Sequence, residues 1–273
     1  MIFVVCFFKT FIIINGEGRH CRPFFIFTKK QMEKIWKEDF VVSWDKTNVK
    51  GRLSFNALSL FLVSTAINHA EHLDFGYSTI SKENVSWVLF RLNIKINRLP
   101  ILNEKINIKT WPGKITGITA TREFEMYSEG TNEKLCMATS DWLIIDLDSR
   151  KPQRMDKYKD ADFLTLNKNA LDQKLPKVNI RCQFEDLFTV KTQYSDLDMN
   201  GHVIAHKYFS WLEDAVYKKF GDKEPNFIQL TFFNECNMDE EILIQHCPDD
   251  NLSFKGIKTK NEKPAFTAAV VLK

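Results

Sequence analysis

Hydrophobic and polar residues follow a pattern that occurs twice along the chain. In the first copy, a short apolar run at 39–44 leads through a polar turn with Gly51. Apolar residues then recur at helical spacing from about 56 to 73. Runs rich in β-branched and aromatic residues follow, separated by turn residues, at 86–96, 105–111, 120–130 and 135–147. The pattern predicts a short strand, one long helix and four further strands.

The second copy repeats this order toward the C-terminus. A strand at 187–194 leads through a polar turn with Gly201 into another apolar helix. Strand-like runs return at 227–236, 241–247, 252–260 and 265–273. When Gly51 is overlaid on Gly201, Trp44 also matches Tyr194, which indicates that one supersecondary unit is repeated.

A long helix followed by an antiparallel run of strands, twice over, is typical of the α+β class. We predict a tandem (double) hotdog, in which each long helix is wrapped by an antiparallel curved sheet. Residues 37–155 form the first hotdog repeat, 156–186 a charged surface connector, and 187–273 the second repeat, which carries the candidate catalytic residues.

Residues 1–36 are an N-terminal extension. Their apolar stretch is interrupted by Lys9 and is far shorter than the roughly 20 residues that a membrane span needs. It also lacks a small-residue cleavage site, so a signal peptide is the weaker interpretation. We expect the native chain to start near Met32, with the preceding residues as upstream sequence.

Composition narrows the function classes further. The net charge is +3, from 38 basic and 35 acidic residues, which is too even for a nucleic-acid-binding protein. The six cysteines are scattered and form neither a CxxC pair nor a structural-zinc spacing. We therefore expect free thiols in a cytoplasmic protein, with no metal site, no cofactor and no stable membrane insertion.

The densest group of polar residues lies in the turn at 194–202, between a predicted strand and the second helix. Asp198, Asn200 and His202 alternate there, so a carboxylate, an amide and an imidazole could face the same side. Backbone N–H groups at the helix start could stabilise an oxyanion. The alternative is that these residues only shape the turn and cap the helix. The first repeat has other residues at the same three positions: Asn48, Lys50 and Arg52.

The segment YSDLDMNGHV, followed by KYFSWLED, closely resembles the catalytic segment of acyl-acyl carrier protein thioesterases, in their bacterial and plant forms. The likeness extends over NHAEHLDFG, WVLFRLNIKI, EKINIKTWP, ATSDWLIIDLDSRKPQR and FFNEC, from about Lys37 to the C-terminus. The resemblance implies a double-hotdog hydrolase that acts on acyl carrier protein bearing a fatty acyl chain, releases free fatty acid and terminates chain elongation.

Carried over by this resemblance, the catalytic positions are Asp198, Asn200, His202 and Glu235, and Cys236 matches a cysteine once proposed as a papain-like nucleophile. The chain departs from the family at the helix start, where the usual HVNN is His202-Val203-Ile204-Ala205. Two amides are thus missing, which places the helix cap in question.

Glu235 and Cys236 are neighbours in the predicted strand 227–236, so their side chains should point to opposite faces. The more polar face suits a site that admits water, which favours Glu235. Cys236 is then a small buried hydrophobe, and a Cys nucleophile activated by His202 is the minority mechanism.

In the favoured mechanism, water attacks the thioester directly. Glu235 holds or deprotonates the water, Asp198 supports the network, and Asn200 and His202 orient and polarise the carbonyl. The choice of base among Glu235, Asp198 and His202 stays open. An acyl-CoA thioesterase, a hotdog enoyl-thioester hydratase and a non-catalytic acyl-carrier-binding protein are the alternatives, and a homodimer is compatible with each.

Weaker candidates have simpler explanations. A metal pair of His69 and His72 lacks a third ligand, so helix-surface or core histidines are the better interpretation. The basic cluster of Lys218, Lys219 and Lys223 is a solvated face or an unspecific docking patch for an acidic carrier. Aromatic residues of the first repeat belong to its core or line an acyl tunnel: Phe55, Phe61, Trp87 and Phe90.

Overall fold

The computed structural model describes residues 33–155, 165–171, 176, 178–250 and 252–273, together with two N-terminal strands. The chain divides into two compact units, Met1–Glu33 and Lys34–Lys273. In the first unit, β1 (Phe3–Phe7) pairs antiparallel with β2 (Thr10–Ile14). The predicted start near Met32 lies outside the described residues.

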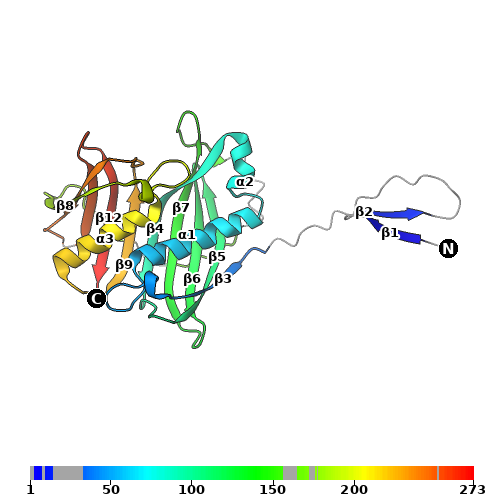
Figure 1. Cartoon of the computed structure of the whole chain (residues 1–273), viewed down its shortest axis with the longest axis horizontal. Helices are drawn as coiled ribbons and strands as arrows, with labels where there is room; N and C mark the ends of the chain where they lie inside the picture. The colour runs from blue at the N-terminus through cyan, green and yellow to red at the C-terminus, as the bar shows by residue number, and fades with distance from the viewer. Residues whose placement is uncertain are drawn as a thin grey trace. The chain divides into compact units, whose positions relative to one another are not determined.

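The second unit is built on one ten-stranded sheet, shown with its helices in Figure 1. The first repeat contributes β3 (Trp36–Val41), β4 (Val85–Ile96), β5 (Lys105–Thr116), β6 (Thr119–Ser128) and β7 (Lys134–Asp146). The second repeat contributes β8 (Glu185–Lys191), β9 (Pro225–Phe232), β10 (Glu241–His246), β11 (Ser253–Lys258) and β12 (Pro264–Leu272). Their order is β3-β5-β6-β7-β4-β9-β12-β11-β10-β8, so the two halves have the same strand order when each is read from its edge to the centre.

The halves join through β4 and β9, which pair antiparallel with Leu92 opposite Leu230. Next to this pair, the Gln229 side-chain amide donates to Asn93 Oδ1 at 2.8 Å, and both residues are buried. A buried amide that finds its partner across the junction avoids the cost of an unsatisfied polar group. The junction is therefore a continuous ladder with satisfied polar groups.

Two long helices, α1 (Phe55–His72) and α3 (Ala205–Phe220), lie on one side of the sheet (Figure 1). They contact each other near their N-termini, where the Asn56 side-chain amide donates to Ser210 Oγ at 2.8 Å. Among the described residues, short elements include α2 (Tyr77–Ile80) and the 3-10 turns η1 (Trp44–Lys46), η2 (Ser81–Glu83) and η4 (Tyr194–Asp196).

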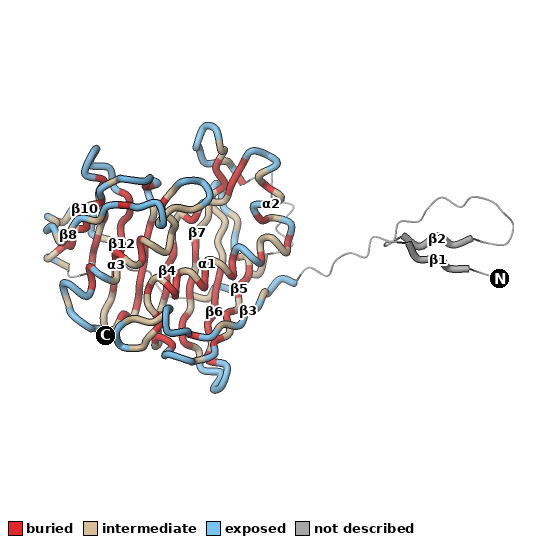
Figure 2. The backbone as a smooth tube through the Cα atoms, in the orientation of Figure 1, coloured by how far each residue is buried: buried red, intermediate tan, exposed pale blue. Residues whose placement is uncertain are grey.

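The main core lies between the helices and the sheet and extends through both repeats. Leu58 and Leu62 of α1, with Phe209 and Leu212 of α3, are at most 1% exposed, and Figure 2 shows the buried stretches that run along the strands. Burying each such side chain stabilises the fold by about 2 kcal/mol. The predicted helices and the α+β class are thus confirmed.

The strand predicted for 227–236 is wrong in its last third, because β9 ends at Phe232. The backbone N–H groups of Phe233 and Asn234 both point at the Ala265 carbonyl, at 2.9 and 3.4 Å, so the regular ladder stops there. The Asn234 side-chain amide then donates to the Pro264 carbonyl at 2.8 Å. Glu235 and the residue after it therefore lie in a loop, where strand alternation does not apply.

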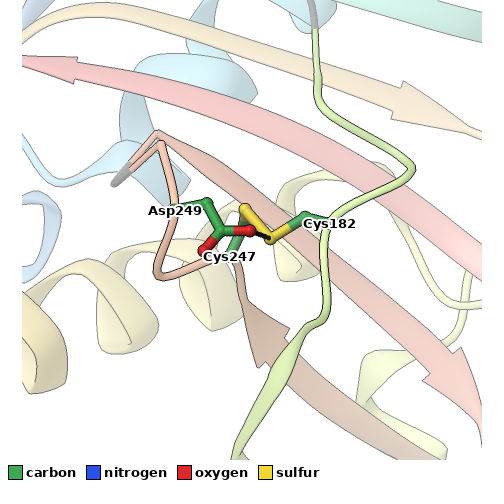
Figure 3. A group of neighbouring side chains, drawn as sticks. All are labelled: Cys182, Cys247 and Asp249. Carbon is green, nitrogen blue, oxygen red and sulfur yellow. Dashed lines mark hydrogen bonds between the residues drawn. A yellow bond between two sulfur atoms is a disulfide. The ribbon is translucent and has the colours of Figure 1, made fainter.

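The expectation of free thiols is wrong for two cysteines. Cys182 and Cys247 form a disulfide with a Cα–Cα distance of 5.8 Å, and the Asp249 carboxylate lies 3.5 Å from Cys182 Sγ (Figure 3). These cysteines are 65 residues apart, a pairing that sequence spacing does not reveal. Because the two sulfurs are bonded to each other, they do not offer thiolates to a metal ion.

Among the described residues, no helix is both long and apolar enough to cross a membrane.

Candidate active site

The turn after β8 is closed by the side chain of Asp198. Its Oδ1 atom accepts the backbone N–H groups of Asn200 and His202, at 2.8 and 3.2 Å, and its own N–H donates to the His202 carbonyl at 2.8 Å. Gly201 adopts φ of 78°, which glycine reaches without a Cβ clash. The Asp198 carboxylate thus holds the backbone rather than the side chains beside it.

The first repeat contains the same turn without the same chemistry. Asn48 Oδ1 accepts the backbone N–H groups of Lys50 and Arg52, at 3.0 and 3.3 Å, and the Asn48 N–H donates to the Arg52 carbonyl at 2.8 Å. An asparagine therefore performs the role of Asp198 in a turn that has no imidazole. This supports the turn-shaping interpretation for Asp198.

Asn200 and His202 lie differently in their turn. Asn200 is exposed. Its backbone N–H donates to Asp198, but its side-chain amide makes no hydrogen bond within the part of the chain that the structure describes. His202 is only 23% exposed, and its Nε2 lies 3.2 Å from Oε2 of Glu235. Of the predicted site residues, His202 and Glu235 are thus the pair whose side chains meet.

Glu235 reaches His202 because its loop is pinned to the turn. The Val203 N–H donates to the Cys236 carbonyl at 2.8 Å, which fixes the backbone beside Glu235. The second carboxylate oxygen of Glu235 is held by the guanidinium of Arg150, from the turn after β7. Sequence reasoning missed Arg150, since nothing local indicates that a turn 85 residues away reaches this loop.

The corresponding turn and loop of the first repeat have neither the histidine nor the glutamate. There the Leu53 N–H donates to the Pro100 carbonyl at 2.8 Å, as Val203 does to Cys236, so Leu99 stands in the position of Glu235. Arg52 stands in the position of His202. Between the two described turns, only the second therefore brings an imidazole and a carboxylate together.

The start of α3 is open, whereas the start of α1 is closed. Ser54 caps α1 with its side chain, and the Glu213 carboxylate accepts the Phe55 N–H at 2.8 Å. Ile204 at the start of α3 gives no side-chain cap, as expected from the missing amides, and the residue that corresponds to Glu213 is Val63. The Lys207 N–H donates to the Ile204 carbonyl at 3.0 Å, so in the described chain the Ala205 and His206 N–H groups remain available to an oxyanion.

Cys236 has an environment unlike that of an activated nucleophile. Its side chain is 0% exposed. Burial raises the pKa of the Cys236 thiol, and a hydrogen bond with the Tyr208 hydroxyl only partly offsets this. Because the thiolate is the reactive form, this burial weighs against a Cys mechanism. The imidazole of His202 meets Glu235 instead.

The histidines of α1 contact aromatic and basic side chains. The rings of His69 and His72 lie 5.8 and 4.7 Å from the Trp36 ring. His69 Nδ1 is also 2.9 Å from Nη1 of Arg122. A guanidinium at one ring nitrogen is the partner of a core histidine, not of a metal ligand.

The other weak candidates also have structural partners. Lys218 donates to the Leu187 carbonyl at 2.7 Å and Lys219 pairs with Glu185 at 3.2 Å, so both exposed side chains make contacts with β8. Phe55 and Phe61 are at most 7% exposed and belong to the main core.

Two family models match the chain. The model described as the acyl-ACP thioesterase N-terminal domain matches residues 33–161, and the model of the C-terminal domain matches residues 179–268.

Curated proteins with related sequences include two plant proteins. The chain is 26% identical over 223 residues to oleoyl-acyl carrier protein thioesterase 2, chloroplastic, of Arabidopsis thaliana; the match covers 75% of this chain and 60% of that protein. It is 25% identical over 255 residues to the oleoyl-acyl carrier protein thioesterase of Coriandrum sativum; this match covers 86% of this chain and 69% of that protein. The chain thus spans less than two thirds of the Arabidopsis relative.

Solved structures share the fold. An acyl-ACP thioesterase from Bacteroides thetaiotaomicron superposes with a TM-score of 0.77 at 24% identity, covering 88% of this chain and 98% of that one. The 12:0-ACP thioesterase from Umbellularia californica superposes with a TM-score of 0.75 at 18% identity, with the same coverage of both chains. The tandem hotdog arrangement is therefore the fold of this chain.

Proposed function

Because the chain belongs to the acyl-ACP thioesterase family, we propose that it hydrolyses fatty acyl-acyl carrier protein, releases the free fatty acid and so terminates chain elongation. The observation that carries this proposal is the pair of His202 and Glu235 beside the open start of α3. A base next to unpaired backbone donors is what the attack of water on a carbonyl requires. The first repeat keeps the turn but not the pair, which supports one site per chain.

The contact between His202 and Glu235 favours His202 as the base among the three candidates. An ionised carboxylate only accepts hydrogen bonds, so the neutral imidazole carries its proton on Nε2 and keeps a lone pair on Nδ1. In this proposal Nδ1 takes a proton from water as water attacks the carbonyl carbon. Glu235 stabilises the imidazolium that forms.

The remaining steps use the helix start and the exposed amide of the turn. The oxyanion of the tetrahedral intermediate is stabilised by the first N–H groups of α3, and Asn200 contacts the carbonyl from the solvent side. The C–S bond then breaks, and the imidazolium of His202 returns its proton to the leaving thiolate. Asp198 keeps the turn in shape throughout.

The test measures free thiol released from a panel of acyl-acyl carrier proteins of different chain length. We expect His202→Ala to lower kcat by about 10²–10⁴-fold, the usual contribution of a general base. Arg52→Ala changes the matched position in the first repeat and should leave kcat unaltered. Full activity in a folded His202→Ala protein would exclude this site.

The same panel separates the alternatives. Faster turnover of acyl-CoA than of the carrier-bound thioester would indicate an acyl-CoA thioesterase, and hydration of an enoyl thioester would indicate a hydratase. Tight binding of the acyl carrier protein without thiol release would indicate a binding protein.

We also propose the cytoplasm as the compartment and a homodimer as the assembly. The disulfide between Cys182 and Cys247 weighs against the cytoplasm, where reductants keep most thiols reduced. Alkylating the protein inside cells before lysis and counting the blocked thiols tests the compartment. Light scattering at several concentrations tests the assembly.

A further inference from the structure

The carboxylate of Glu235 is shared between partners from both repeats. Oε2 faces Nε2 of His202 at 3.2 Å, and Oε1 accepts a hydrogen bond from Nη2 of Arg150. Arg150 follows β7 and therefore belongs to the first repeat. We infer that Arg150 is a positioning residue that orients Glu235 toward His202, an inference that rests on the proposed hydrolysis.

The backbone of Arg150 is fixed by bonds that do not involve its side chain. Its N–H donates to the Asp146 carbonyl at 2.9 Å, and the Asp146 N–H donates to the Lys151 carbonyl at 3.0 Å. The Ser149 N–H donates to Asp146 Oδ1 at 2.7 Å. The turn can therefore form whatever side chain stands at position 150.

Arg150 adopts a backbone conformation that an arginine does not favour. Its φ is 57°, in the left-handed region where glycine has no steric cost. Of the described non-glycine residues with positive φ, five are Asn or Asp, which tolerate this region, and the others are Arg150 and Glu262. Glycine would suit this turn better, and the steric cost of arginine here is offset if its side chain has a use, which the contact with Glu235 supplies.

That use is the orientation of a carboxylate on a partly exposed loop. The Glu235 side chain is 39% exposed, and without the guanidinium it could rotate away from His202 into solvent. The backbone beneath it stays in place, because the buried Lys258 ammonium contacts the Glu235 carbonyl and the Val203 N–H holds the Cys236 carbonyl. Loss of Arg150 should therefore disturb the orientation of Glu235 and leave the fold intact.

Arg150→Gly tests this inference, because it removes the side chain and relieves the backbone at once. We expect kcat for thioester hydrolysis to fall about ten- to a hundredfold, the range for a hydrogen bond to a charged group, with KM unchanged. The Tm should stay equal or rise. Arg150→Lys keeps the positive charge but not the planar guanidinium, so its kcat should lie between those of Arg150→Gly and the original protein. Added guanidinium at millimolar concentration should partly restore the kcat of Arg150→Gly.

Glu262→Gly is the matched control. Glu262 has the same backbone conformation, with φ of 57°, in the exposed turn between β11 and β12. Its replacement should affect the Tm as Arg150→Gly does and leave kcat unchanged.

Arg150→Gly with the kcat of the original protein would overturn the inference. So would a loss of activity that follows a fall in Tm and that guanidinium does not reverse. If the unaltered protein releases no thiol from any acyl carrier substrate, the proposed function itself fails, which is a separate result.

Discussion

Reduction of the disulfide between Cys182 and Cys247 should destabilise the second repeat. The bond closes a loop over a sequence separation of 65 residues, which contains β8, the turn with His202, α3, β9 and Glu235. Cross-linking a loop of this length removes chain entropy from the unfolded state, which is worth about 4 kcal/mol at 25 °C. For a chain of this size, a loss of that order lowers the Tm by about 10 °C.

Thermal unfolding with and without a dithiol reductant measures this loss. Titration of thiols in the denatured protein should first show two more thiols after reduction than before. The double variant Cys182→Ser with Cys247→Ser should have the Tm of the reduced protein and should not respond to reductant. A disulfide that is present by titration but whose reduction leaves the Tm unchanged would refute the loop-entropy reasoning.

Three further predictions concern single residues of the site and its scaffold. Cys236→Ala should retain most hydrolytic activity while losing about 1 kcal/mol of stability. Cys136→Ala changes the other buried free cysteine and should show the same small loss of stability with its activity kept. An inactive but folded Cys236→Ala protein would restore the nucleophile hypothesis. Asp198→Asn should keep both stability and activity, because an asparagine holds the same turn in the first repeat; a large fall in kcat at unchanged Tm would assign a chemical role to this carboxylate. Hydrogen bonds from Arg98 hold the pKa of Glu104 at about 2, against a usual 4.5. The stabilisation is therefore present above pH 4.5 and lost as the pH falls through 2. Glu104→Gln should cost about 2 kcal/mol at pH 7, after a discount for solvent around the arginine, and flatten the acid side of the stability curve measured by denaturant titration.

The regular elements were predictable because each repeat buries one face of a helix against a sheet. The helices predicted from apolar spacing end within a few residues of α1 and α3, since Leu58 and Leu212 must face the core wherever the chain goes. The strands were predictable for the same reason. β9 was predicted too long, because Phe233 and Cys236 extend the run of apolar residues past Phe232, whereas the regular ladder of hydrogen bonds ends there.

Two long-range contacts, one at the site and one in its scaffold, were not predictable from local sequence. Arg150 reaches Glu235 from a turn in the other repeat, and Cys182 bonds to Cys247 across 65 residues. Neither pairing leaves a periodic signal, because periodicity reports burial on one element and not which distant segment lies next to it. The turn at Asp198 was ambiguous for a different reason, since residues that shape a turn and residues that do chemistry are of the same types.

Comparison of the two repeats supports one interpretation of each residue in this turn. A feature kept in both copies is explained by the fold that they share, and a feature found in one copy needs a further reason. The turn bonds of Asn48 and Asp198 belong to the first kind. His202 and Glu235 belong to the second, since Arg52 and Leu99 fill the same positions without forming the pair. The uncapped start of α3 also belongs to the second kind, because at the start of α1 the Glu213 carboxylate of α3 accepts the Phe55 N–H. The proposed base, the carboxylate beside it and the proposed oxyanion donors thus all differ between the copies at one end of the second helix. A change that served only stability would have closed the helix start rather than opened it.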